Sequence, residues 1–139
     1  MKGPPKLANT SWSSSILSDW NAVDSACRAI RTVLDNQQLG ERGFAVELLA
    51  RECLANAVRH GNAGNRRKRV QVRIVCGRKW IRLEIEDQGK GFDWRRLRLR
   101  QPGEKSPSGR GLPIIYSYAG RVRFNRQGNQ IKLWVSKTT

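Results

Sequence analysis

The sequence predicts an α+β protein, a two-layer sandwich in which helices cover one face of a mostly antiparallel sheet. Two segments near the N-terminus repeat apolar residues at the three- and four-residue steps of amphipathic helices. Two later pairs of segments alternate apolar and polar residues, and a short turn joins each pair, as in a β-hairpin. Because hairpin strands are antiparallel and 139 residues suffice for one core, the helices are expected to layer on a single sheet.

Residues 1–17 are rich in Pro, Ser, Thr and Asn, so we predict a tail that leads into one short edge strand. Residues 18–139 are predicted to form a single domain. No apolar run approaches the roughly 18 residues that a membrane span requires, and the start of the chain lacks the apolar run of a signal peptide. The expected location is therefore the cytoplasm, with no membrane partner.

Two amphipathic helices are predicted in the first half of the chain. The first has Ser18 as its expected N-cap, and its apolar stripe consists of Trp20, Val23, Cys27, Ile30 and Leu34. The second runs from about Arg42 to His60, and its apolar stripe consists of Val46, Leu49, Ala50, Cys53 and Ala57. The cysteines are odd in number and widely spaced, so buried reduced thiols are expected at Cys27, Cys53 and Cys76.

The second half of the chain is predicted to contain both hairpins. The first hairpin is expected to span residues 70–85 and to turn at residues 77–79, and the last is expected to span residues 121–135. Between them, residues 93–108 are basic and poorly periodic, which predicts a loop. A short apolar helix is expected over residues 112–118.

The formal net charge of +16 is concentrated in the second half of the chain. Residues 1–64 hold seven basic and six acidic side chains, whereas residues 65–139 hold twenty basic and five acidic ones. Such a field attracts nucleotide phosphates, nucleic acid or an acidic protein surface. The run Arg66–Arg69 lacks interleaved aromatic residues, so a solvated loop or an acidic partner is favoured there and nucleic acid is disfavoured.

The predicted second helix carries Glu52, Asn56 and His60 at steps of four residues. A carboxylate one turn before an amide oxygen suits a proton acceptor beside a Mg²⁺ ligand, since Mg²⁺ prefers oxygen donors. A solvated polar face explains the same spacing. His60 fits either a phosphate contact or a helix-end residue that packs against the following loop.

Two glycine motifs follow the helix. Asp87-x-Gly89-x-Gly91-Phe92 lies at a strand end, where the aspartate can accept a hydrogen bond from an exocyclic amine and the glycines allow close backbone approach. A tight turn is the alternative interpretation. The second motif, residues 108–112, places glycines at the start of a predicted helix, which is a natural phosphate site, although it lacks the Lys-Ser/Thr ending of a P-loop. An ordinary loop-to-helix junction is the alternative interpretation.

Together the three motifs resemble the N, G1 and G2 boxes of the GHKL ATPase superfamily, which includes gyrase and the histidine kinases. The resemblance covers roughly residues 15–136 and implies the Bergerat-type ATP-binding fold, with ATP and Mg²⁺ as cofactors. It implies that Glu52 is the general base, Asn56 the Mg²⁺ ligand and Asp87 the adenine contact. The other nucleotide contacts that it implies are Ala57, His60, Gly89, Gly91, Phe92, Lys105, Ser108, Gly109, Arg110, Gly111 and Leu112.

Within the superfamily, residues 52–62 and 108–112 most resemble the anti-sigma factor serine kinases. That resemblance implies phosphorylation of a Ser or Thr on a STAS-domain anti-anti-sigma partner, sequestration of a sigma factor and a homodimer. The chain departs from the pattern at residues 118–122, where two acidic residues are missing, and at Gln88, where Glu is common. A catalytically weak ATP-binding anti-sigma module, a histidine kinase catalytic domain and a basic nucleic-acid-binding protein remain as alternatives.

Overall fold

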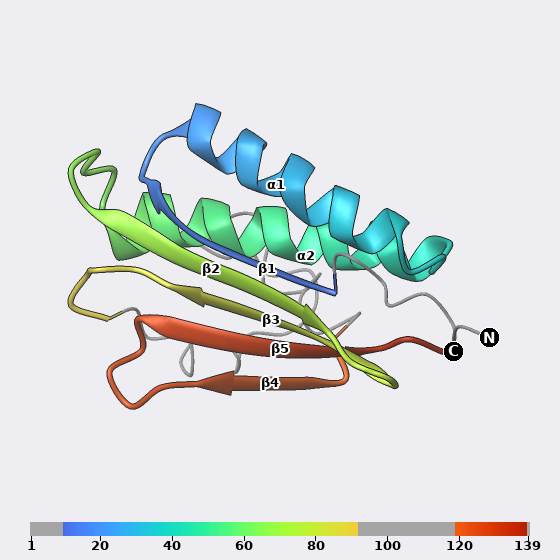
Figure 1. The fold of residues 1–139 in the computed structure, drawn as a ribbon. Helices are drawn as coiled ribbons and strands as arrows, with labels where there is room; N and C mark the ends of the chain where they lie inside the picture. Colours follow the sequence, from blue (N-terminus) through green and yellow to red (C-terminus); the bar gives the residue numbers. More distant parts are fainter. Residues whose placement is uncertain (1–9, 92–118, 139) are drawn as a thin grey trace, which may run out of the picture.

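A five-stranded antiparallel sheet with helices on one face forms the molecule (Figure 1), in a computed structural model that describes residues 10–91 and 119–138. In chain order the strands are β1 (Ser11–Leu17), β2 (Arg69–Cys76), β3 (Trp80–Glu86), β4 (Arg121–Phe124) and β5 (Gln130–Ser136). Their order across the sheet is β1-β2-β3-β5-β4, and all neighbouring strands are antiparallel. The predicted α+β sandwich is therefore confirmed, with β1 as an edge strand.

Among the described residues, two helices and one π-helical turn form the second layer. They are α1 (Trp20–Asp35), α2 (Glu41–Asn56) and the π-helical turn η1 (Ala57–Gly61). The predicted N-cap of α1 is wrong by one residue, because Asp19 is extended and its Oδ1 accepts a hydrogen bond from the Ala22 amide at 2.7 Å. Ser18 is instead buried, and its hydroxyl donates to the Lys68 carbonyl at 2.6 Å.

The core lies between the helices and the inward residues of the three central strands. Alternation places one face of β2, β3 and β5 against the helices, through Val70, Val72, Ile74, Ile81, Leu83, Ile85, Ile131, Leu133 and Val135. The predicted helix stripes are buried as expected, with one exception. Trp20, at the start of α1, is 51% exposed, and the Arg59 guanidinium lies 5.6 Å from its ring centroid.

The two predicted hairpins are confirmed, as β2–β3 and β4–β5. All three cysteines are free and buried, and burial raises the pKa of each thiol, which keeps the thiols protonated. The predicted loop at residues 93–108 and the predicted helix at 112–118 lie outside the described residues. Within the described ranges, no helix is both long enough and apolar enough to cross a membrane.

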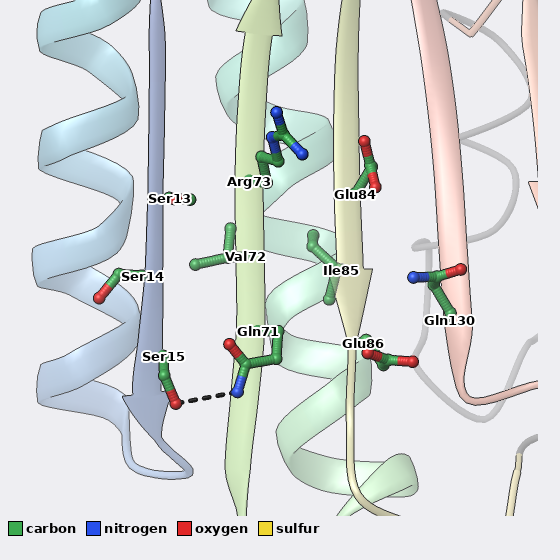
Figure 2. Close-up of a pocket in the computed structure, with 10 residues that line it drawn as sticks. All are labelled: Ser13, Ser14, Ser15, Gln71, Val72, Arg73, Glu84, Ile85, Glu86 and Gln130. Atoms are coloured by element: carbon green, nitrogen blue, oxygen red, sulfur yellow. Dashed lines mark hydrogen bonds between the residues drawn. The ribbon is translucent and has the colours of Figure 1, made fainter.

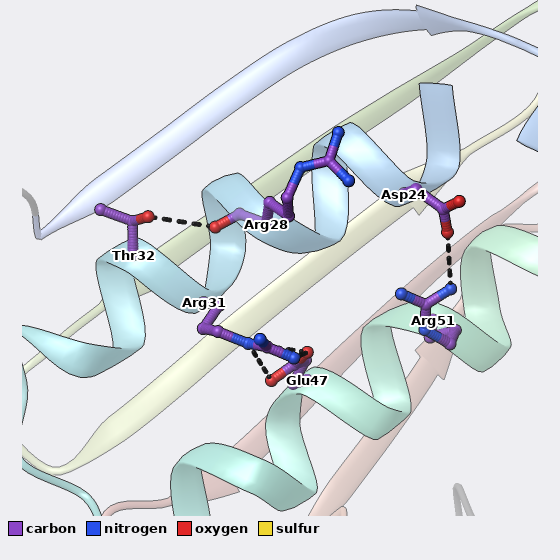
Figure 3. A network of polar contacts seen from close by, with 6 residues as sticks. All are labelled: Asp24, Arg28, Arg31, Thr32, Glu47 and Arg51. Atoms are coloured by element: carbon purple, nitrogen blue, oxygen red, sulfur yellow. Dashed lines mark hydrogen bonds and ion pairs between the residues drawn. The ribbon is translucent and has the colours of Figure 1, made fainter. Parts of the chain in front are cut away.

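Ion pairs join the exposed surfaces of α1 and α2 (Figure 3). Arg31 donates from Nε to both carboxylate oxygens of Glu47, at 3.0 and 3.1 Å, and Arg51 donates to Asp24 at 2.9 Å. The Arg51 and Asp24 side chains are 47% and 49% exposed, so solvent screens their attraction. Apolar packing between the layers, rather than these pairs, is expected to dominate the stability of the fold.

Two substitutions in α2 are expected to lower the free energy of unfolding by unequal amounts. Leu49→Ala removes a fully buried side chain and is expected to lower the free energy of unfolding by about 2–5 kcal/mol. Arg51→Ala removes an exposed pair and is expected to lower it by less than about 1 kcal/mol. Urea denaturation followed by circular dichroism measures both. A larger loss for Arg51→Ala than for Leu49→Ala would contradict this assignment.

Candidate functional site

The end of α2 and the end of β3 meet at one end of the sheet. Gly61 closes η1, and Asp87 follows β3 directly. A Cβ atom added at Gly61 would overlap the Asp87 carboxylate, and one added at Gly89 would overlap the Gly61 carbonyl. Only glycine at both positions allows so close an approach. The structure thus brings together two of the three sequence motifs.

Asn56, the last residue of α2, is buried and unusual in its hydrogen bonding. The residue is 1% exposed, and neither its Oδ1 nor its Nδ2 has a hydrogen-bond partner among the described residues. An unsatisfied buried polar group costs about 1–3 kcal/mol, so such a group in a native fold calls for an explanation. A carboxamide oxygen is a suitable Mg²⁺ ligand, and Asn56 therefore fits a site for that ion.

Glu52 lies one helical turn before Asn56 and is half-buried. Side chains four residues apart in an α-helix lie on the same side of the helix. Glu52 therefore lies on the same side of α2 as Asn56, and its role as a proton acceptor stays a prediction.

Asp87 is a buried carboxylate, only 4% exposed. Its Oδ1 accepts a hydrogen bond from the Gly89 amide at 2.7 Å. Burial raises the pKa of Asp87, although the Gly89 hydrogen bond acts in the opposite direction. The carboxylate retains acceptor capacity beyond this one bond, so it can receive an N–H donor from a ligand.

The turn between β4 and β5 supports the loop that follows Asp87. Asn129 exchanges two hydrogen bonds with the Asp87 backbone, both at 2.9 Å, and Gln127 donates to the Gly89 carbonyl at 3.1 Å. Gly91 has φ of +107°, and a Cβ atom there would overlap the Gln127 carbonyl. Gly91 is thus required both by its backbone conformation and by the neighbouring turn.

Sequence reasoning missed the role of Asn62, which is fully buried and fully bonded. Its Nδ2 donates to the Ser18 hydroxyl at 2.7 Å and to the Arg69 carbonyl at 3.0 Å, and its Oδ1 accepts from the Gln88 amide at 2.8 Å. Asn62 therefore ties η1 to β2 and to the loop after β3. In the sequence, this role of Asn62 is indicated only by its position directly after Gly61, at the end of the first motif.

The predicted extent of this helix, from about Arg42 to His60, agrees with the structure, but its last turn is π-helical, because α2 ends at Asn56 and η1 continues to Gly61. The Asn62 amide donates to the Ala57 carbonyl, five residues earlier, at 2.8 Å. His60 lies within this turn and is half-buried. Ala57 is 2% exposed and belongs to the core.

The remaining predicted nucleotide contacts cannot be placed on the fold. They lie outside the described residues, and they are Phe92, Lys105, Ser108, Gly109, Arg110, Gly111 and Leu112. The described part of the candidate site therefore consists of Glu52 and Asn56 on α2 together with the loop from Asp87 to Gly91.

A family model described as a histidine kinase-like ATPase domain matches residues 16–136. The matched range contains both helices and four of the five strands in full. No curated protein matches the chain. ATP binding is the property that such a domain implies, and it agrees with the motifs that the structure brings together.

Two buried asparagines of the site allow a matched test of the unsatisfied amide. Asn56→Leu replaces a group without a described partner by an apolar one, so it is expected to raise the free energy of unfolding by roughly 1–3 kcal/mol in the absence of ligand. Asn62→Leu removes three hydrogen bonds and is expected to destabilise the protein. Chemical denaturation measures both, and destabilisation by Asn56→Leu equal to that by Asn62→Leu would contradict the assignment.

Burial of Asp87 predicts a pH-dependent effect of Asp87→Asn on thermal stability. Because the pKa of Asp87 is raised in the folded protein, its ionised form is disfavoured there, and this cost is fully present above the folded pKa. The variant is therefore expected to melt at a higher temperature than the wild type at about pH 7. The difference should shrink as the pH falls toward about 4, the ordinary pKa of Asp. A variant that melts lower at neutral pH would show that the fold needs the charge.

Proposed function

Because this chain belongs to the histidine kinase-like ATPase family, we propose that it is an anti-sigma factor serine kinase. It transfers the γ-phosphoryl group of ATP to a Ser or Thr of a STAS-domain anti-anti-sigma partner, and it sequesters a sigma factor. The observation that carries this proposal is the buried amide of Asn56, which has no partner in the described part of the chain and follows Glu52 by one turn.

Recognition of the adenine is assigned to Asp87. Its buried carboxylate accepts one backbone hydrogen bond, and an exocyclic amine of the base would supply a second donor. Gly61 and Gly89 hold the carboxylate in place through contacts that no larger residue permits. The phosphates are assigned to residues 108–112, on the strength of the resemblance and of the glycine-rich helix start that the sequence predicts there.

The transfer itself depends on position and charge. The hydroxyl oxygen of the partner's Ser or Thr forms a bond to the γ-phosphorus, the bond from that phosphorus to the bridging oxygen breaks, and ADP leaves. Glu52 accepts the hydroxyl proton. This role requires the carboxylate of Glu52 to lie within hydrogen-bond reach of the substrate hydroxyl. Asn56 would hold Mg²⁺, which neutralises charge on the phosphate oxygens.

The basic charge of the chain supports a protein partner with an acidic surface. Residues 65–139 carry twenty basic and five acidic side chains, a field that would attract such a surface at long range. A homodimer is part of the same proposal and rests on the resemblance to the anti-sigma kinases. A second candidate is an ATP-binding anti-sigma module with weak catalysis, in which partner binding does not depend on Glu52.

Glu52→Gln distinguishes the kinase from the weakly catalytic module. Transfer of labelled γ-phosphate to a panel of purified STAS-domain proteins is expected to fall by at least about 100-fold, the usual contribution of a general base, while ATP affinity is retained. Glu41→Gln, at the exposed start of the same helix, is the matched control and should leave transfer unchanged. ATP binding without transfer by the wild type would favour the weak module.

A further inference from the structure

The face of the sheet opposite α1 and α2 (Figure 1) is open to a further role. Near the β2–β3 turn, the outward residues of β3, β4 and β5 are basic and aromatic. Strand alternation places six residues on this face, each next to a residue that faces the core. We call them the indole patch, and they are Trp80, Arg82, Arg121, Arg123, Lys132 and Trp134. They come from β3, β4 and β5, which are neighbours in the sheet.

Register aligns the side chains of the indole patch in rows across the strands. Arg82 pairs with Trp134, and Trp134 pairs with Arg121 on its other side. The Arg121 guanidinium lies 5.1 Å from the centroid of the Trp134 ring, within the range of a cation–π contact. An aromatic ring is thus flanked by two arginines on neighbouring strands.

Trp80 adds a second indole beside this row. It pairs with Ser136, so Trp134 is its diagonal neighbour on β5, close enough for large side chains to act together. A Cβ atom at Gly120 would lie 2.9 Å from the Trp80 ring, so the indole rests against the backbone at Gly120. Trp80 nevertheless remains 44% exposed, which leaves ring surface available to a ligand.

The charge of the indole patch is positive. Glu84, in the adjoining row, lies 2.7 Å from Arg82 and 3.9 Å from Lys132. Among the described residues, no ion pair involves Arg121 or Arg123. Within the part of the chain that the structure describes, two cations therefore lie beside two indoles with no carboxylate paired to them.

The other half of the same face differs in chemistry (Figure 2). A groove of about 370 Å³ there is lined by serine and glutamine side chains and by Arg73, Glu84 and Glu86. The outward carboxylates of β3 both line this groove. A polyanion on the face would therefore be drawn to the indole patch rather than to the groove.

We propose that the indole patch binds single-stranded nucleic acid, an activity beyond phosphoryl transfer. Bases stack on Trp80 and Trp134, and Arg121 and Arg123 contact phosphates. Each nucleotide of a single strand supplies a flat ring and a negative charge, so it matches both components of the patch. A duplex keeps its bases stacked on one another, and an acidic protein surface matches the cations alone.

The fold supplies what the sequence lacked for this function. The basic run Arg66–Arg69 has no interleaved aromatic residues, whereas sheet pairing places Trp134 between Arg82 and Arg121, which are both distant from it in the sequence. The sheet therefore creates an arrangement of aromatic and basic side chains that sequence patterns do not reveal.

Fluorescence anisotropy with labelled oligo(dT) and oligo(U), each about 16 nucleotides long, tests the proposal. The wild type is expected to bind both strands, and a preference for either identifies DNA or RNA. Trp80→Ala should weaken binding by about tenfold, as expected for one stacked base, and Trp80→Phe should restore most of it. Arg121→Gln with Arg123→Gln should lower the slope of log affinity against log salt by about 1.4, since two phosphate contacts are lost.

Arg28→Gln with Arg42→Gln is the control of equal charge, because both arginines lie in the helices on the other side of the sheet. It should leave affinity nearly unchanged. Equal losses for the two double variants, or no binding of either strand by the wild type, would overturn the proposal. Polyglutamate or duplex DNA could instead bind as tightly as single strands, with no effect of Trp80→Ala. That result would overturn the proposal in favour of a site that recognises negative charge alone. If Trp80→Ala does not fold, as judged by circular dichroism, the two double variants still decide the result.

Discussion

The close packing of Gly61 against Asp87 and Gly89 is the constraint on which the candidate site depends. It joins the end of α2 to the end of β3, two segments that the sequence separates by 25 residues or more. Asn62 fixes this junction by three hydrogen bonds to β2, to the loop after β3 and to Ser18. Without side chains at the two glycines, a buried carboxylate can lie directly beside the turn that follows Asn56.

Two buried polar groups with spare hydrogen-bonding capacity lie near this junction, and both are expected to lower the stability of the protein without ligand. Asn56 has an amide without a described partner, and burial raises the pKa of Asp87. Polar groups kept at a cost to stability are typical of binding and catalytic sites, where the missing partners come from the ligand. A nucleotide with its metal ion supplies the complementary groups, an amine for Asp87 and a cation for Asn56.

Most of the fold could be predicted from the sequence because its hydrophobic periods are regular. The alternation in β2, β3 and β5 and the stripes of α1 and α2 specify which faces are buried. The N-cap of α1 and the π-helical turn could not be predicted, because adjacent Ser18 and Asp19 both suit a cap and no residue pattern identifies a π turn. The motifs predicted the roles of Asn56 and Asp87, which stay predictions, whereas the supporting bonds of Asn62 and Asn129 depend on contacts between distant segments.

Isothermal titration with ATP and with a non-hydrolysable analogue, in the presence and absence of Mg²⁺, tests the central claim most directly. The account predicts saturable binding by the wild type that Mg²⁺ strengthens and that Asp87→Ala abolishes. Melting curves of the free proteins would confirm that the variant is folded. Binding that is absent from the wild type, or that survives Asp87→Ala unchanged, would contradict the claim that this junction is a nucleotide site.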